Sequence, residues 1–453
     1  MSAIVKEQQY SLKPSAVKAK RYTREIPSLG GTASTYNMGD TAVFYLPAGL
    51  AGNFMDGQTA YLKFTIVNSI VSAAGGTTPS FACDYTGASI VRSISIYGSG
   101  GALIEQIDRY STLANCLYDA QLTGSAVCGL SPMIGSNNQD YTTANATFRT
   151  GRNLASTVTA STTTVQYYTL CIPIISSLFN LSEKYFPIYA CSSDDIRIEI
   201  QLDTQINAFV QSGTNITSQT ATIFNPTIVV DYIEVDNMAM GQIQSLYAGR
   251  DLVVHSTSFH TYESTISAST SGAFTQIIPS KVMSAKNMLF TWRNLPTTAV
   301  QAGYTQTSRL NPFLGALSTF NLNLGGLRVP NKPITVQKAS DVSQFFAELQ
   351  KAFHGLGDLR LGSLLSNTSY TSVTDPAVGT LPNAAAFVAG INLDQFRGQS
   401  DVLLSGMDLS KITTYYEANY VTATADEIVT VDAFVHHDVL LIIDANGSLT
   451  VKF

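Results

Sequence analysis

Short runs of alternating apolar and polar residues recur along most of the chain, separated by turns rich in Gly, Asn, Ser and Thr. The clearest run has one face made of Ile196, Ile198, Ile200 and Leu202 and the other made of Arg197, Glu199 and Gln201. Successive side chains of a strand point to opposite faces, so this run predicts a strand with one buried and one solvated face. Many such runs predict a many-stranded antiparallel β protein.

Two stretches about half a chain apart share one plan: an alternating strand, a glycine-rich turn and a short amphipathic helix. In the first, a strand at 93–97 reaches the glycine-rich turn 98–101, and the predicted helix carries Ile107, Tyr110, Ala114 and Leu117 and stops at Gly124. In the second, a strand through Phe320, Leu322 and Leu324 reaches Gly325-Gly326, and a helix is predicted at about 340–353. The repetition predicts two similar β domains in tandem.

The length of 453 residues supports that division, because it suits two β domains of roughly 200 residues better than one. The predicted division is a basic N-terminal arm at 1–30, a first domain at 31–245 and a second domain at 246–453. The chain closes with a predicted hairpin, in which Val439–Ile443 and Leu449–Phe453 flank the turn 444–447. The C-terminus is therefore expected to lie within a sheet.

Charge is scarce and unevenly placed. Charged residues make up 13% of the chain, against a usual share of about 25%, which favours a surface partly covered by other subunits. The net charge of −6 argues against a main body that grips nucleic acid. Residues 1–24 are nevertheless basic, and the candidate arm residues are Lys13, Lys18, Lys20, Arg21 and Arg24. Such an arm is either a solvated terminus or reaches nucleic acid, a lipid headgroup surface or a neighbouring subunit.

The cysteines indicate free thiols. Cys83, Cys116, Cys128, Cys171 and Cys191 are odd in number and form no C-x-x-C pair. This pattern predicts synthesis in a reducing compartment, the cytoplasm or nucleus. No apolar stretch reaches roughly 18 residues, and the Lys-rich N-terminus lacks a signal-peptide core, so neither a membrane span nor secretion is expected.

Catalytic and metal-binding patterns are weak. The sequence has no G-x-S-x-G, H-E-x-x-H, Walker or dinucleotide motif, so neither an enzyme nor a cofactor is predicted. The one cluster to consider joins His255 and His260 with His436-His437-Asp438. Neighbours in a strand face opposite ways, so only one of His436 and His437 could join a metal site. We therefore expect core or interface histidines and no metal.

Several segments resemble a known family. They are 90–101 followed by Leu103-Ile104-Glu105-Gln106-Ile107-Asp108-Arg109-Tyr110, then 184–187, 196–200, 278–282 and 405–409. In order and spacing, the region 42–453 resembles the double jelly-roll major capsid proteins of the adenovirus and tectivirus lineage. The compact members in polinton-like viruses, adintoviruses and virophages are the most similar in form. The segment from Leu103 is expected to be the family's helix.

The resemblance implies an all-β fold of two tandem eight-stranded antiparallel jelly rolls with short helices in loops. It further implies a homotrimer with pseudo-hexameric outline that tiles an icosahedral capsid around a DNA genome, located in the virion. Neighbouring capsomers, penton and minor capsid proteins would be partners. The arm would face inward, toward DNA or an internal membrane, and the loops Asn137–Ser161 and Pro296–Pro312 would contact other subunits. The loops are shorter than in adenovirus-like members, so large towers are not expected.

Two alternatives remain from other classes. A lectin-like or spike β-sandwich would bind carbohydrate through exposed aromatic residues, but the single Trp292 lies in a segment typical of strand core. A two-domain cupin-like enzyme would use His255, His260 and His436 as metal ligands.

Overall fold

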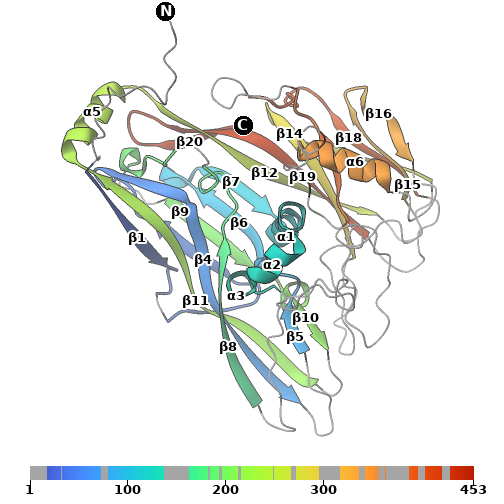
Figure 1. The fold of residues 1–453 in the computed structure, drawn as a ribbon, viewed down its shortest axis with the longest axis horizontal. Coiled ribbons are helices and arrows are strands. Elements are labelled where there is room, and N and C mark those ends of the chain that lie inside the picture. Colours follow the sequence, from blue (N-terminus) through green and yellow to red (C-terminus); the bar gives the residue numbers. More distant parts are fainter. Residues whose placement is uncertain are drawn as a thin grey trace, which may run out of the picture.

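The computed structural model describes most of the chain. The described residues are 18–31, 33–72, 80–136, 163–181, 184–192, 196–212, 216–247, 249–266, 272–294, 317–335, 342–354, 356, 363, 387–395, 404–420 and 429–453. Figure 1 shows two β units side by side, with β1 on one side and β16 on the other.

Eight strands build the first unit. They are β1 (Ala19–Pro27), β3 (Thr41–Leu46), β4 (Asn53–Ser72), β6 (Val91–Tyr97), β7 (Leu103–Asp108), β8 (Thr163–Pro173), β9 (Ile196–Leu202) and β11 (Ile216–Val235). They form two antiparallel sheets in the orders β1-β11-β4-β8 and β3-β9-β6-β7. Three of the minor strands belong here: β2 (Thr35–Asn37) pairs with β11, and β5 (Ser80–Cys83) pairs with β10 (Phe209–Ser212).

The second unit repeats this order. Its strands are β12 (Leu252–Ile266), β13 (Gly272–Ile278), β14 (Ala285–Asn294), β15 (Leu317–Leu324), β16 (Leu327–Thr335), β17 (Ala389–Asn392), β18 (Thr414–Tyr420) and β19 (Val429–Ile443). The sheets run β12-β19-β14-β17 and β13-β18-β15-β16. In both units the first strand lies beside the eighth and the second beside the seventh, which is the strand order of a jelly roll. The predicted all-β fold of two tandem eight-stranded jelly rolls is confirmed.

Helices are short. They are α1 (Tyr110–Gln121), α2 (Gly124–Gly129), α3 (Ser131–Ile134), α4 (Gln205–Ala208), α5 (Asn237–Tyr247) and α6 (Ser343–Ala352), with 3-10 turns η2 (Gly87–Ile90), η3 (Ser99–Gly101) and η4 (Ile188–Ala190). The sequence analysis missed α5, which links β11 to β12. Each of the five sheets takes its strands from one side of residue 246, and we keep that residue as the proposed boundary. Within the described ranges, no helix has the length and apolar character needed to cross a lipid bilayer.

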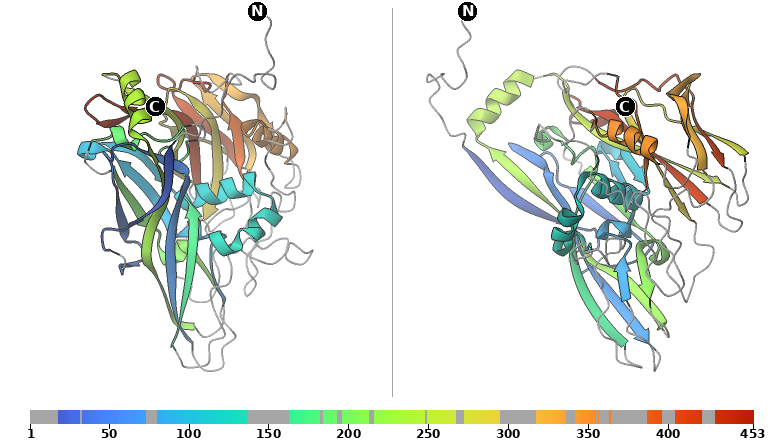
Figure 2. Two further views of the ribbon diagram at one scale, coloured as in Figure 1. Left: turned by 60° about the vertical axis from the view of Figure 1, so that its left-hand side comes forward. Right: turned by 45° about the vertical axis from the view of Figure 1, so that its right-hand side comes forward.

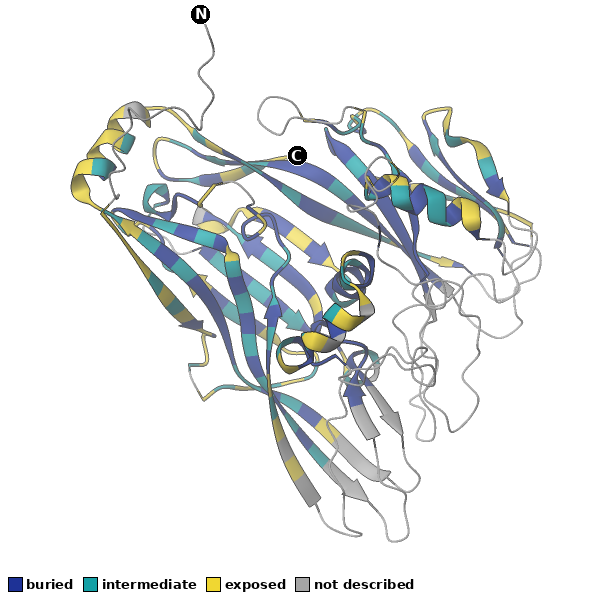
Figure 3. Cartoon of the chain, viewed as in Figure 1, coloured by how far each residue is buried: buried dark blue, intermediate teal, exposed yellow. Residues whose placement is uncertain are grey.

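The alternating pattern explains the core. In β9, Ile196, Ile198 and Ile200 are buried while the residues between them are partly exposed. Figure 3 shows the same alternation of buried and more exposed positions along strands of both units. Burial of these apolar side chains is the main favourable contribution to folding.

The repeated plan contains one more strand than predicted. Residues 103–108 form β7, which pairs with β6, so the prediction of a helix there is wrong and α1 begins only at Tyr110. The second copy likewise inserts β16 before α6. Ile104 and Ile107 are spaced as in a helix, but Glu105 between them is also buried, because another part of the protein covers the second face of β7. Both hairpins turn at glycines with left-handed φ, such as Gly325 at 61° and Gly326 at 100°.

The predicted closing hairpin is confirmed. The strand β20 (Leu449–Lys452) pairs with β19, and Leu449 is buried. Beyond β20, the Phe453 ring lies 5.2 Å from the His260 ring, between centroids. The C-terminus therefore belongs to the second jelly roll.

Candidate functional site between the two jelly rolls

The two jelly rolls meet where β7 of the first packs against β12 of the second. Thr261 on β12 donates a hydrogen bond of 2.7 Å to the Asp108 carbonyl oxygen. Arg109, directly after β7, donates through Nη2 to the Glu263 carboxylate at 2.6 Å. The contact fixes the two units relative to each other through polar groups as well as apolar packing.

Glu105 lies in the centre of this contact and is 4% exposed. Its carboxyl accepts hydrogen bonds from the Ser177 backbone N–H at 3.0 and 2.9 Å, and from the hydroxyl of Ser258 on β12. Ser256, also on β12, donates to the Ser177 carbonyl oxygen at 2.6 Å. Burial raises the pKa of Glu105, and the hydrogen bonds to its carboxyl only partly oppose that effect. Glu105 therefore joins the two jelly rolls through a buried carboxyl whose pKa is raised above its ordinary value.

We expect Glu105→Gln to flatten the dependence of stability on pH. A raised folded-state pKa means that the contribution of Glu105 is complete below its ordinary pKa and is lost as the pH rises toward the raised value. The amide stays neutral, so that loss should disappear. The measurement is the urea midpoint between about pH 4 and pH 8, followed by the fluorescence of Trp292, the only tryptophan. The matched control is Glu234→Gln, at an exposed site. An unchanged slope in Glu105→Gln would contradict the assignment.

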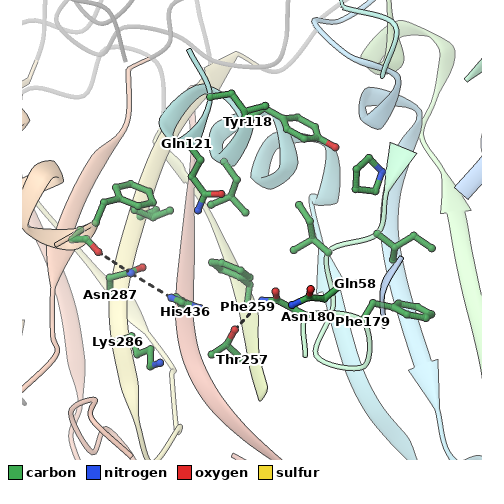
Figure 4. Close-up of a pocket in the computed structure, with 18 of the residues that line it drawn as sticks. Gln58, Tyr118, Gln121, Phe179, Asn180, Thr257, Phe259, Lys286, Asn287 and His436 are labelled. Atoms are coloured by element: carbon green, nitrogen blue, oxygen red, sulfur yellow. Dashed lines mark hydrogen bonds between the residues drawn. The ribbon is translucent and has the colours of Figure 1, made fainter. Parts of the chain in front are cut away.

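A cavity of about 920 Å³ opens beside this contact and is lined by both jelly rolls (Figure 4). Its apolar wall includes Leu117, Ile174, Phe179, Leu289 and Phe353. Its polar wall includes Gln58, Tyr118, Gln121, Asn180, Lys286, Asn287, His354, Asp394 and His436. The lining therefore combines hydrophobic contact with hydrogen-bonding groups.

Two hydrogen-bonded groups of the cavity are drawn in Figure 4. Asn180 of the first jelly roll donates to Thr257 Oγ1 of the second at 3.0 Å. Asn287 donates to the Ala352 carbonyl oxygen at 3.2 Å and lies 3.3 Å from His436 Nδ1. Among the described residues, Asn287 Oδ1 and Tyr118 Oη have no hydrogen-bond partner. The first of these hydrogen bonds joins the two jelly rolls at the cavity wall, and the group around Asn287 lies within the second jelly roll.

The predicted histidine cluster is divided between two faces of β19. The His436 ring stacks on Phe259 with centroids 4.6 Å apart, whereas the His437 ring lies 4.4 Å from His260. Burial lowers the pKa of His436 to about 4 and that of His437 to about 3, so both rings are neutral near pH 7. In the described part of the chain, no group of three or more His, Cys, Asp or Glu side chains is arranged to hold a metal ion.

Asp438 forms a separate polar cluster in the second jelly roll. Its carboxylate lies 3.0 Å from both His255 Nε2 and Lys286 Nζ, and it accepts a hydrogen bond of 2.6 Å from Ser284. Burial alone would raise the pKa of Asp438. The hydrogen bonds and the charge of Lys286 outweigh burial and bring the pKa to about 2. The cluster ties β12 and β14 to β19.

The candidate arm residues fall into two groups. Lys13 lies outside the described residues, whereas residues 19–27 of the predicted arm form β1, which pairs along its length with β11. The arm is therefore shorter than the predicted 1–30. The sequence does not reveal the pairing of β1 with β11, because about 200 residues separate the two strands. Arg21 is held by Asp56 at 2.7 Å and Asp231 at 2.8 Å.

The remaining arm residues are more available. Lys18 and Lys20 are exposed, and the Arg24 guanidinium lies 5.7 Å from the Tyr232 ring centroid. The predicted contact loops, Asn137–Ser161 and Pro296–Pro312, lie outside the described residues, and their role stays a prediction. Cys83, Cys116, Cys171 and Cys191 are free thiols, as expected.

No protein-family model and no curated protein matches the sequence. Solved structures do match over nearly the whole chain. A chain of the Sputnik virophage has a TM-score of 0.62 at 11% identity, covering 100% of this chain and 93% of that one. The PBCV-1 virus capsid gives 0.57 at 12% identity, covering 97% and 98%. The mavirus major capsid protein gives 0.54 at 10% identity, covering 95% and 90%. With both strand orders matching a jelly roll, this chain is a double jelly-roll protein and shares its fold with viral capsid proteins.

Proposed function

We propose that the chain is the major capsid protein of a DNA virus and assembles as a homotrimer with pseudo-hexameric outline into an icosahedral shell. The observation that carries the proposal is the likeness to viral capsid chains along both jelly rolls and over nearly the full length of each chain. A likeness confined to one jelly roll would fit many functions, because single jelly rolls occur in lectins and cupins as well.

The construction of the chain supports a structural role. The two sandwiches are joined by buried hydrogen bonds from Ser256 and Ser258 on β12, which suits a unit that tiles as one body. The low share of charged residues suits a surface that is covered in an assembly. The solved structures that match give no support to carbohydrate binding, and the single tryptophan, Trp292, is fully buried and so is not offered to a sugar.

The proposed location is the virion, with neighbouring capsomers, penton and minor capsid proteins as partners. The proposed inner-face arm comprises Lys13, Lys18, Lys20, Arg21 and Arg24, in contact with DNA or an internal membrane. Since Arg21 is held by two carboxylates, Lys18 and Lys20 are, among the described residues of this group, the best placed to meet an external anion. Synthesis in a reducing host compartment agrees with the free thiols.

The test is the mass of the purified protein by light scattering, with negative-stain imaging of the same sample. We expect a mass of three chains of 48.6 kDa with a hexagonal outline, or closed shells. A stable monomer that never assembles over a range of salt and pH would overturn the proposal.

A further inference from the structure

The cavity between the jelly rolls is enclosed by elements of both. In Figure 1 and in both views of Figure 2, α1 of the first jelly roll and α6 of the second lie on the same face of the chain. The lining takes residues from the C-terminal half of α1 and the end of α6, together with residues of β12 and β14. Segments far apart in the sequence therefore enclose a space that neither jelly roll forms alone.

The walls of this cavity are held in place by the protein itself. The hydrogen bond of 3.0 Å from Asn180 to Thr257 joins the two jelly rolls, and the bond of 3.2 Å from Asn287 to the Ala352 carbonyl oxygen fixes the end of α6 to β14. A site that is already formed costs little ordering when a molecule binds. The volume of about 920 Å³ lies within the range of roughly 300–1,000 Å³ that is usual for small-molecule sites.

One part of the lining is continuous with the hydrophobic core. Ile174, Phe179 and Leu289 are buried members of the core, and Leu117 and Phe353 pack against it. These side chains come from both jelly rolls. Contact with hydrocarbon is more favourable for such a wall than contact with water. A molecule that fills the cavity should therefore contain an apolar portion.

The other part of the lining offers hydrogen-bond donors. Lys286 and His354 line the cavity with side chains that are 23% and 45% exposed. The carboxylates beside them already have partners: Asp438 binds the Lys286 ammonium at 3.0 Å, and Asp394 accepts from Ser405 at 3.0 Å and lies 3.1 Å from His354 Nε2. Within the described ranges, Asp438 is the one hydrogen-bonding partner of the Lys286 ammonium, which has more N–H donors than that bond uses. A ligand should therefore present an acceptor oxygen here.

The two parts of the lining face each other across the cavity. Figure 4 shows Lys286, Asn287 and His436 together on the side of the second jelly roll and Phe179 on the opposite side. The charge of Lys286 is balanced by Asp438, so an uncharged oxygen can serve as its acceptor as well as a carboxylate can.

We propose that this cavity binds a single-chain amphiphile, a molecule with one acyl chain and an oxygen-bearing head group. The acyl chain packs against the apolar wall, and a head-group oxygen accepts a hydrogen bond from the Lys286 ammonium. The inference goes beyond the proposed function, because the site is built from residues of one chain and holds a ligand that tiling does not require.

The test is the binding of the neutral dye Nile red to the full chain, followed by fluorescence, and its displacement by monodecanoylglycerol and by decanoate below their micelle concentrations. The blocking variant is Gln121→Trp, because Gln121 is exposed on α1 and lines the cavity, so a larger side chain occupies the space without disturbing the core. The matched control is Ser125→Trp, at an exposed position of α2 outside the lining.

We expect one saturable dye site per chain in the unsubstituted protein and in Ser125→Trp, and binding about tenfold weaker in Gln121→Trp. Displacement by monodecanoylglycerol would identify a neutral head group, and displacement by decanoate an acidic one. Either supports the proposal. Equal affinities of Gln121→Trp and Ser125→Trp, or no displacement by either amphiphile, would overturn it.

Native mass spectrometry of the unsubstituted protein with monodecanoylglycerol and with decanoate is a second measurement that needs no variant. One bound molecule per chain is expected with at least one of them, and none with either would contradict the assignment. Light scattering of the same samples reports assembly separately. A trimer that binds no amphiphile would remove the ligand site and leave the capsid proposal standing, whereas a monomer that binds one would do the reverse.

Discussion

Asp438→Ala is expected to lower the free energy of unfolding of the second jelly roll by about 3 kcal/mol. The carboxylate is 1% exposed and binds Lys286 and His255, which come from two other strands. Removing it takes away the carboxylate that pairs with the Lys286 ammonium and the hydrogen-bond partner of the His255 ring. Removing one partner of a fully buried pair costs about 3–5 kcal/mol, and Lys286 is partly exposed, so the low end applies.

The same residue predicts how stability responds to acid. Its pKa of about 2 lies below the ordinary value of 3.8, so its contribution is present above about pH 4 and is lost as the pH falls toward 2. The difference corresponds to about 2 kcal/mol. Asp438→Asn, which has no proton to gain there, should lose less stability than the unsubstituted protein over this range.

Urea unfolding followed by Trp292 fluorescence measures both effects, because the only tryptophan lies in the second jelly roll. Asp251→Ala, at an exposed aspartate, is the control and should change the midpoint little. If Asp438→Ala behaves like Asp251→Ala, the cluster does not stabilise the fold.

Trp292→Ala is expected to cost about 3–5 kcal/mol. The indole is fully buried, and its centroid lies 6.3 Å from Phe320 and 5.6 Å from Phe387. Its Nε1 donates to Tyr420 Oη at 3.3 Å, so truncation opens a cavity and also removes a donor from a buried hydroxyl. Trp292→Phe should cost less, because it keeps most of the aromatic volume.

This variant loses the fluorescent probe, so far-UV circular dichroism during urea unfolding is the measurement. Tyr167→Ala, which removes an aromatic ring that is 69% exposed, is the matched control and should stay within about 0.5 kcal/mol of the unsubstituted protein. Equal midpoints for Trp292→Ala and Tyr167→Ala would show that Trp292 is not part of a close-packed core.

The division of the histidines was predictable from local geometry. Because successive side chains of a strand point to opposite faces, His436 and His437 had to face apart, and the structure has them against Phe259 and His260, respectively. The sequence placed His255 and Asp438 in one candidate cluster, and the structure has them 3.0 Å apart, but the sequence did not indicate that Lys286 and Ser284 would also bind Asp438. His255 lies near the start of β12, Lys286 lies near the start of β14, and Ser284 directly precedes β14. Only the sheet order brings these segments together around Asp438.

Local patterns in the sequence determined the β class, the strand β9, the closing hairpin and the tandem repeat, since strand alternation and turn residues act over a few neighbours. Only the tertiary structure decided that β1 pairs with β11 and that residues 103–108 form a strand. Glu105 shows the reason. A carboxylate in the sequence predicts a solvated position, and it is buried here because a strand more than 140 residues later covers it and supplies Ser258.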